Sequence, residues 1–110
     1  MISDDEVEKA AEYLRDNATK AARAKAERIY MVEYRKTVKA QLMQEHQADA
    51  LGTQERNAYA DPRYKQHLEA MKEAVERDEY YSWMKTAAEA KLEARRTLQA
   101  NARAEGKAYG

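Results

Sequence analysis

The first 51 residues contain no glycine and no proline, and a second such stretch runs from residue 63 to residue 105. Gly and Pro end helices and form the tight turns that connect strands. With three Gly and one Pro in 110 residues, a β-sandwich, a barrel or an α/β fold lacks the turn residues it needs. Both stretches are rich in Ala, Glu, Lys, Arg and Gln, which favour helix. The sequence therefore predicts an all-α protein.

Local signals predict where the helices begin and end. Ser3 and Glu6 have the spacing of a capping box, and Asp61 before Pro62 pairs a preferred N-cap with a preferred first helical residue. Gly52 is expected to end the first helix in a left-handed conformation. We therefore predict helices over about 4–51 and 62–104, a short helical turn at 54–59 and a frayed tail at 105–110.

A connection of about ten residues is short enough for the second helix to return beside the first. We expect a single domain over residues 1–110, built as a long antiparallel helical hairpin. Of its 48 hydrophobic residues, 22 are Ala, and so small a core barely offsets the cost of ordering the chain. A homo-oligomer, in particular a four-helix bundle of two hairpins, or a complex with another protein is therefore expected.

Apolar residues of the first helix recur every 11 positions, which predicts a straight or slightly right-handed pairing of the helices. One series is Val7, Ala18, Ile29, Ala40 and Leu51, and a second, parallel series is Ala10, Ala21, Val32 and Met43.

Antiparallel pairing about the 52–61 connection brings the large apolar residues of the two helices together halfway along the hairpin. We expect their rings to form a core or an interface. The aromatic residues concerned are Tyr30, Tyr34, Tyr80, Tyr81 and Trp83.

Charge is balanced overall, with 20 Lys and Arg against 20 Asp and Glu, so only a local cationic region can attract nucleic acid. Residues 15–39 and 91–110 are the two cationic segments, and the predicted register places 15–23 beside 91–99. A basic band with nearby aromatic rings suits contact with phosphates and unpaired bases, although such residues also serve as a solvated helix face. The candidate nucleic-acid or partner-binding residues are Arg15, Lys20, Arg23, Lys25, Arg28, Arg35, Lys36, Arg95, Arg96 and Arg103.

The sequence contains no arrangement typical of an enzyme, a cofactor site or a metal site. There is no Cys, no Gly-rich phosphate loop and no Ser in a nucleophile-elbow context. His46 and His67 lack the spacing of a zinc helix and are interpreted as ordinary polar residues of the helix surface. We expect a non-enzyme without cofactor or metal, and a metalloenzyme remains a distant alternative.

The acidic start of the chain does not resemble a secretion signal, and no stretch approaches about 20 apolar residues. We therefore expect no membrane contact and a cytoplasmic location.

Three segments resemble small helical proteins of tailed bacteriophages: residues 57–64, residues 67–70 and residues 91–96. That resemblance implies an accessory protein of the kind encoded near recombination and replication functions, working in the cytoplasm of a host cell. It also admits an inhibitor of a host defence complex, similar to anti-CRISPR proteins, or a phage assembly adaptor.

The leading hypothesis is a non-enzymatic accessory protein that binds DNA or a DNA-processing partner through its Arg and Lys side chains. The alternative is a protein-binding module that docks through its aromatic centre and helix faces.

Overall fold

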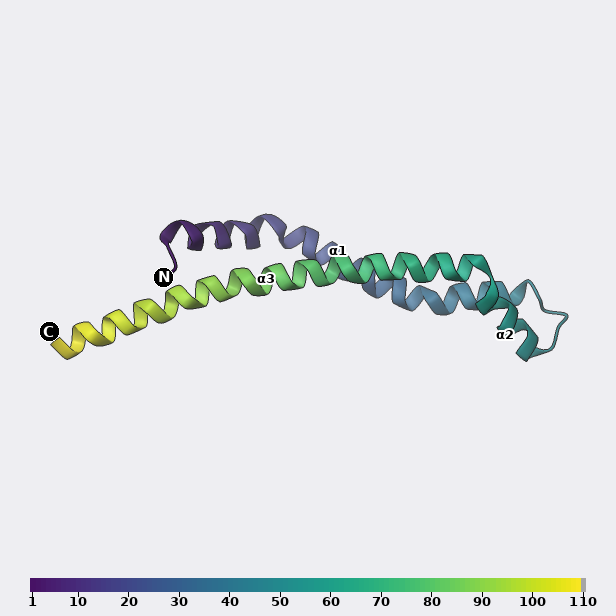
Figure 1. Cartoon of the computed structure of the whole chain (residues 1–110). Helices are drawn as coiled ribbons and strands as arrows, with labels where there is room; N and C mark the ends of the chain where they lie inside the picture. The colour runs from purple at the N-terminus through teal and green to yellow at the C-terminus, as the bar shows by residue number, and fades with distance from the viewer. Residues whose placement is uncertain (110) are drawn as a thin grey trace. The chain divides into compact units, whose positions relative to one another are not determined.

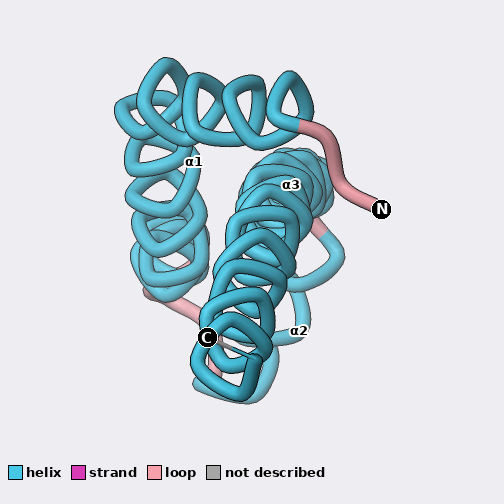
Figure 2. The backbone as a smooth tube through the Cα atoms, turned by 90° about the vertical axis from the view of Figure 1, so that its left-hand side faces the viewer, coloured by secondary structure: helices cyan, strands magenta, loops and turns pink. Residues whose placement is uncertain are grey.

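The computed structural model describes residues 1–109, and Gly110 lies outside the described range. Three helices follow one another along the chain (Figure 1): α1 (Asp4–Gln44), α2 (Leu51–Ala60) and α3 (Pro62–Tyr109). Helix takes up almost all of the described chain, and residues 1–109 contain no strand (Figure 2). The all-α prediction is confirmed.

Both predicted helix starts are confirmed at the level of side-chain hydrogen bonds. The backbone N–H of Glu6 donates to the Ser3 hydroxyl at 3.1 Å, and the Ser3 N–H donates back to the Glu6 carboxylate at 3.4 Å. At the start of α3, the Asp61 carboxylate accepts the backbone N–H of Arg63 at 2.8 Å. Free N–H groups of each first turn are thereby satisfied.

The predicted end of the first helix is wrong, because α1 stops at Gln44 and not at Leu51. The segment 45–50 forms turns whose carbonyls at Gln47 and Asp49 accept hydrogen bonds from the Gln54 side chain, at 3.4 and 2.8 Å. By turning there, the chain brings Glu55 back to Lys39, whose amine lies 2.9 Å from the Glu55 carboxylate. This ion pair and the packing of Leu42 with Ala58 and Tyr64 are the long-range contacts that accompany the early end of α1.

Two further boundaries also differ from the prediction. Gly52 lies inside α2, a ten-residue helix in place of the expected short turn at 54–59, and no residue of the described chain has a positive φ. At the other end, α3 continues through Gly106 to Tyr109, so residues 105–109 of the predicted frayed tail are helical. Gly in a helix costs about 1 kcal/mol relative to Ala, and the long helix tolerates that cost.

The described chain divides into two compact units, which we describe separately. Among the described residues, the terminal unit comprises residues 1–21 and 80–109, and the hairpin unit comprises Ala22–Glu79. In the hairpin unit the second half of α1, the short α2 and the first part of α3 meet around Leu42, Ala58 and Tyr64. Val38 and Met43 pack against this cluster.

The two predicted 11-residue series differ in burial. In the second series, Ala10 is buried and Ala21, Val32 and Met43 are half-buried. In the first series, Ala18, Ile29, Ala40 and Leu51 are all exposed. Most of the residues of α1 that are buried or half-buried follow alternating spacings of three and four, a heptad pattern that the exposed Arg35 interrupts. The residues that follow this pattern are Val7, Ala10, Leu14, Asn17, Ala21, Ala24, Arg28, Met31, Val38 and Leu42.

The same spacing occurs on α3, so the α1–α3 seam of each unit is of coiled-coil type. Its buried or half-buried members are Tyr64, His67, Met71, Ala74, Asp78, Tyr81, Ala88, Leu92 and Arg95.

The register of the hairpin unit also differs from the prediction. Arg28 forms an ion pair with Asp78, whereas a hairpin closed at 52–61 would place Arg28 opposite Thr86. The early end of α1 and the insertion of α2 account for this shift.

The terminal unit has a very small core. Its buried hydrophobic residues are two alanines, Ala10 and Ala88. Its two segments carry opposite charge: residues 1–21 contain six acidic and three basic side chains, and residues 80–110 contain three acidic and six basic ones. An ion pair between Asp4 and Arg95 joins them. Charge attraction therefore assists a contact that buries little apolar surface.

Candidate binding surfaces

The outer side of α3 in the terminal unit exposes large apolar side chains. Trp83 is 70% exposed, Tyr80 is 56% exposed, and Met84 and Leu98 are also exposed. Together with three exposed alanines they form what we call the outer stripe, defined as Tyr80, Trp83, Met84, Ala87, Ala90, Ala94 and Leu98.

The outer stripe has the geometry of a second packing face. Tyr80, Trp83, Ala87, Ala90 and Ala94 alternate spacings of three and four, as coiled-coil seams do. At 100° per residue, this face lies roughly 130° around the helix from the seam toward α1. In the terminal unit, one apolar face of α3 therefore packs against α1, and a second apolar face is exposed. Exposed apolar faces of this kind mark interaction sites.

Of the five aromatic residues, Tyr34 and Tyr81 are half-buried. Trp83, Tyr80 and Tyr30 are exposed and form no core within the described chain, which leaves the interface alternative of the prediction. The register shift accounts for this, because the opposed arrangement of rings required the hairpin to close at 52–61. Their role in an interface with another molecule stays a prediction.

In the terminal unit, Tyr81 is half-buried, and its ring meets that of Tyr80 edge-on at 5.3 Å between centroids. Tyr13 lies near both, and its hydroxyl is buried without a hydrogen-bond partner among the described residues. Burial is the main cause that raises the pKa of Tyr13, and the two neighbouring tyrosines raise it further. Tyr81 and Tyr13 thus belong to the packing of this unit.

In the hairpin unit, Tyr30 stacks on Tyr34 with 5.5 Å between ring centroids, and Tyr34 tilts against the ring of His67 at 5.8 Å. Nε2 of His67 lies 2.7 Å from the backbone carbonyl oxygen of Met31. When Nε2 carries its proton, it donates to that carbonyl. His67 is therefore engaged in holding α3 against α1.

Half of the ten candidate cationic residues are engaged with nearby carboxylates. These ion pairs are Arg15–Asp16, Arg28–Asp78, Lys36–Glu33, Arg95–Asp4 and Arg96–Glu93. Of these five, Arg95 meets Asp4 at the acidic start of α1, and Arg28 lies in the seam of the hairpin unit. The predicted basic band stays a prediction.

The remaining five candidate cations are exposed and make no ion pair within the described chain: Lys20, Arg23, Lys25, Arg35 and Arg103. Each unit as a whole is neutral, with nine acidic and nine basic side chains in the terminal unit and eleven of each in the hairpin unit. Neither unit therefore has the net positive charge that would attract nucleic acid over a distance.

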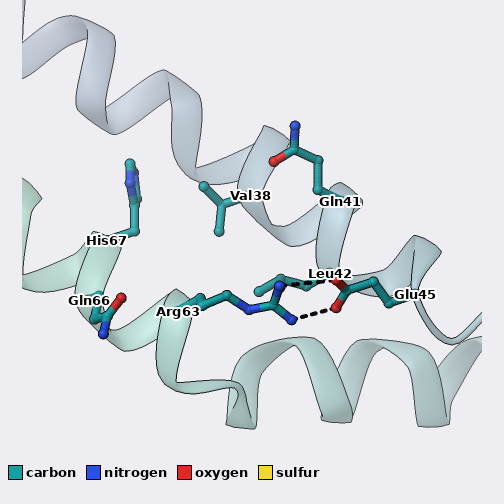
Figure 3. A pocket seen from close by; sticks show the side chains of 7 residues that line it. All are labelled: Val38, Gln41, Leu42, Glu45, Arg63, Gln66 and His67. Atoms are coloured by element: carbon teal, nitrogen blue, oxygen red, sulfur yellow. Dashed lines mark hydrogen bonds and ion pairs between the residues drawn. The ribbon is translucent and has the colours of Figure 1, made fainter.

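A shallow pocket of about 480 Å³ lies in the hairpin unit, where the end of α1 meets the start of α3 (Figure 3). Figure 3 shows Arg63 reaching from α3 to Glu45, with two hydrogen bonds between the guanidinium and the carboxylate. Arg63 also contacts Asp61, and these bonds lower the pKa of Glu45 and hold the pKa of Asp61 at about 2.

Arg63 is thus paired with both carboxylates at the mouth of the pocket, and His67 is engaged with Met31. The pocket therefore offers no free acid–base pair and no nucleophile. Within residues 1–109, no three His, Asp or Glu side chains are placed to hold a metal ion. No helix of this range is long and apolar enough to cross a membrane.

Sequence reasoning did not single out the alanines of the outer stripe, Ala87, Ala90 and Ala94. Their three-and-four spacing with Trp83 is the signal that identifies this second face. Comparison with known protein families, curated proteins and solved structures finds no match to this chain.

Proposed function

We propose that the protein is a non-enzymatic helical interaction module, which works by binding another polypeptide along the outer stripe of α3. The observation that carries this proposal is the exposure of Trp83, flanked by Tyr80 and Met84, in a unit whose own buried hydrophobic residues are two alanines. Trp and Tyr each bury about 150–250 Å² when covered and dominate the energetics of interfaces.

The shape of the site also favours a helical or extended partner. The outer stripe is a row of side chains along one helix, and the two described pockets are shallow hollows. A row at three-and-four spacing is complementary to another apolar helix face. A phage adaptor and an inhibitor of a host defence complex are two settings in which such a module would work.

A photo-crosslinking amino acid placed at Trp83 tests this proposal. We expect crosslinks from position 83 to a polypeptide, either in cells that make the protein or in the purified sample. The matched control is position 100, where Ala100 is exposed on α3 but lies away from the outer stripe. Equal and low crosslinking from positions 83 and 100 under both conditions would refute the proposal.

A second candidate function is nucleic-acid binding through the five unpaired cations. The observation that favours it is the exposure of Lys20, Arg23 and Lys25 on α1 without ion pairs to described residues. Each phosphate neutralised would release counterions, so affinity should fall steeply with salt. This candidate function is the weaker one, because neither unit has a net positive charge and half of the candidate cationic residues are already paired with carboxylates.

Titration of fluorescent single-stranded and duplex oligonucleotides at low and moderate salt tests the second candidate. Arg23→Ala should reduce the steepness of the salt dependence, whereas Arg96→Ala should change it less, since Arg96 is paired with Glu93. An absence of binding at low salt would exclude this function.

A further inference from the structure

We propose that the outer stripe is the interface between two copies of this chain, which pack antiparallel along α3. This inference rests on the interaction surface proposed above and names its occupant. It places Trp83 of each copy against Ala94 of the other.

The order of large and small residues along the outer stripe carries the argument. Tyr80, Trp83 and Met84 lie at one end, Ala87, Ala90 and Ala94 follow, and Leu98 lies at the other end. In an antiparallel pair centred between Ala87 and Ala90, each aromatic residue meets a small residue, because Tyr80 falls opposite Thr97.

Volume complementarity of this kind is what close helix packing requires. A parallel arrangement of the same stripe is less favourable, because it places Trp83 opposite Trp83 and alanine opposite alanine. The aromatic end would then hold the helices apart, and the alanines would leave a gap between them. The antiparallel order therefore fits a second copy better.

The available area agrees with a dimer of moderate affinity. Each copy offers the exposed parts of Tyr80, Trp83, Met84 and Leu98 and of the three alanines. Their sum is on the order of 500 Å² of apolar surface. A standard interface buries about 800 Å² per partner, and the stems of rim residues such as Lys91 add to the apolar part. An interface of this size is typical of a reversible dimer.

Sedimentation equilibrium over a concentration series tests the dimer directly. Wild-type protein should pass from monomer to dimer as concentration rises, and Trp83→Ala should weaken the association at least tenfold. Ala90→Glu should give a monomer, because it places a charge in the middle of the interface. Circular dichroism should report unchanged helix content for Ala90→Glu, since Ala90 is exposed and Glu favours helix.

Ala100→Glu is the matched control for Ala90→Glu. It makes the same chemical change on an exposed position of the same helix, outside the outer stripe, and should leave dimerisation unchanged. A wild-type protein that stays monomeric at every concentration would overturn the proposal. Equal dimerisation by wild type and Ala90→Glu would overturn it as well.

Disulfide crosslinking tests the orientation, because the natural sequence contains no cysteine. A mixture of Ala87→Cys and Ala90→Cys proteins should form a crosslinked dimer on oxidation. Ala94→Cys alone should not, because the two copies of position 94 lie about 16 Å apart along an antiparallel pair, too far for a disulfide. Self-crosslinking by Ala94→Cys would indicate a parallel pair and overturn the antiparallel arrangement.

The photo-crosslinking experiment separates failure of the dimer from failure of the interaction module. If position 83 crosslinks only to a different protein, the module stands and the dimer is wrong. If it crosslinks to nothing above the position 100 control, both are wrong.

Discussion

The guanidinium of Arg28 and the carboxylate of Asp78 form an ion pair across the seam between α1 and α3 of the hairpin unit. The Asp78 side chain is 16% exposed and the Arg28 side chain 33% exposed, so both charges are partly withdrawn from water. Such a pair favours one register of a coiled-coil seam over its neighbours, because a shift of one turn leaves both charges without partners.

Replacement of Asp78 by Ala should lower the free energy of unfolding by about 1–2 kcal/mol, since it leaves the Arg28 guanidinium without its partner in the seam. Urea denaturation of the two proteins measures the difference. The double variant Arg28→Met/Asp78→Leu should recover most of the loss, because neither charge then remains.

The surface pair Lys36–Glu33 supplies the control, since both of its side chains are well exposed. Lys36→Ala should change the stability by less than about 0.5 kcal/mol. If Asp78→Ala lowers the free energy of unfolding no more than Lys36→Ala does, the Arg28–Asp78 pair does not set the register of the seam.

Short-range signals in the sequence were sufficient to predict the fold class and two helix starts. The Ser3–Glu6 capping box and the Asp61–Pro62 start depend on residues within three positions of one another. The end of α1 depends instead on Lys39 reaching Glu55 and on the packing of Leu42 against Ala58. No local pattern near Gln44 indicates those contacts.

The heptad was missed for a related reason. Three of its positions on α1 hold Asn17, Arg28 and Arg35, so a search for recurring apolar residues rejects it. The Asp78 partner of Arg28 explains one of these exceptions, and only the folded chain reveals it. The wrong register then followed from the missed helix end, and with it the expectation that the ring of Trp83 meets the aromatic rings of α1 within one chain.

Replacement of Gly52 by Ala should raise the free energy of unfolding by about 0.5–1 kcal/mol, because Gly52 occupies a helical position in α2. A Cβ added there has no atom within 4 Å to clash with. Thermal denaturation monitored by circular dichroism measures the gain. A loss of stability would mean that Gly52 adopts the left-handed conformation of a helix end, as the sequence alone had indicated.

Replacement of Tyr13 by Phe should leave the stability of the protein unchanged or slightly higher. The Tyr13 hydroxyl is buried without a partner among residues 1–109, so its removal relieves a desolvation cost and breaks no hydrogen bond within that range. Urea denaturation tests this, and a loss above about 1 kcal/mol would show that the hydroxyl has a hydrogen-bond partner.

The Asp61 carboxylate at the start of α3 should make the free energy of unfolding depend on pH in the acid range. Hydrogen bonds from the Arg63 side chain and backbone lower the pKa of Asp61 from 3.8 to about 2. A lowered pKa in the folded state means that the ionised carboxylate stabilises the fold. This contribution is fully present above pH 3.8 and is lost as the pH falls through about 2.

Asp61→Asn isolates this contribution, since Asn is also a good N-cap but does not titrate. Its free energy of unfolding should therefore fall less than that of the wild type when the pH is lowered from 3.8 to about 2. Urea denaturation across this range gives both curves. Asp16→Asn, which removes an exposed carboxylate outside the Arg63 network, should follow the wild-type curve. Parallel curves for wild type and Asp61→Asn would mean that Arg63 does not stabilise the ionised Asp61.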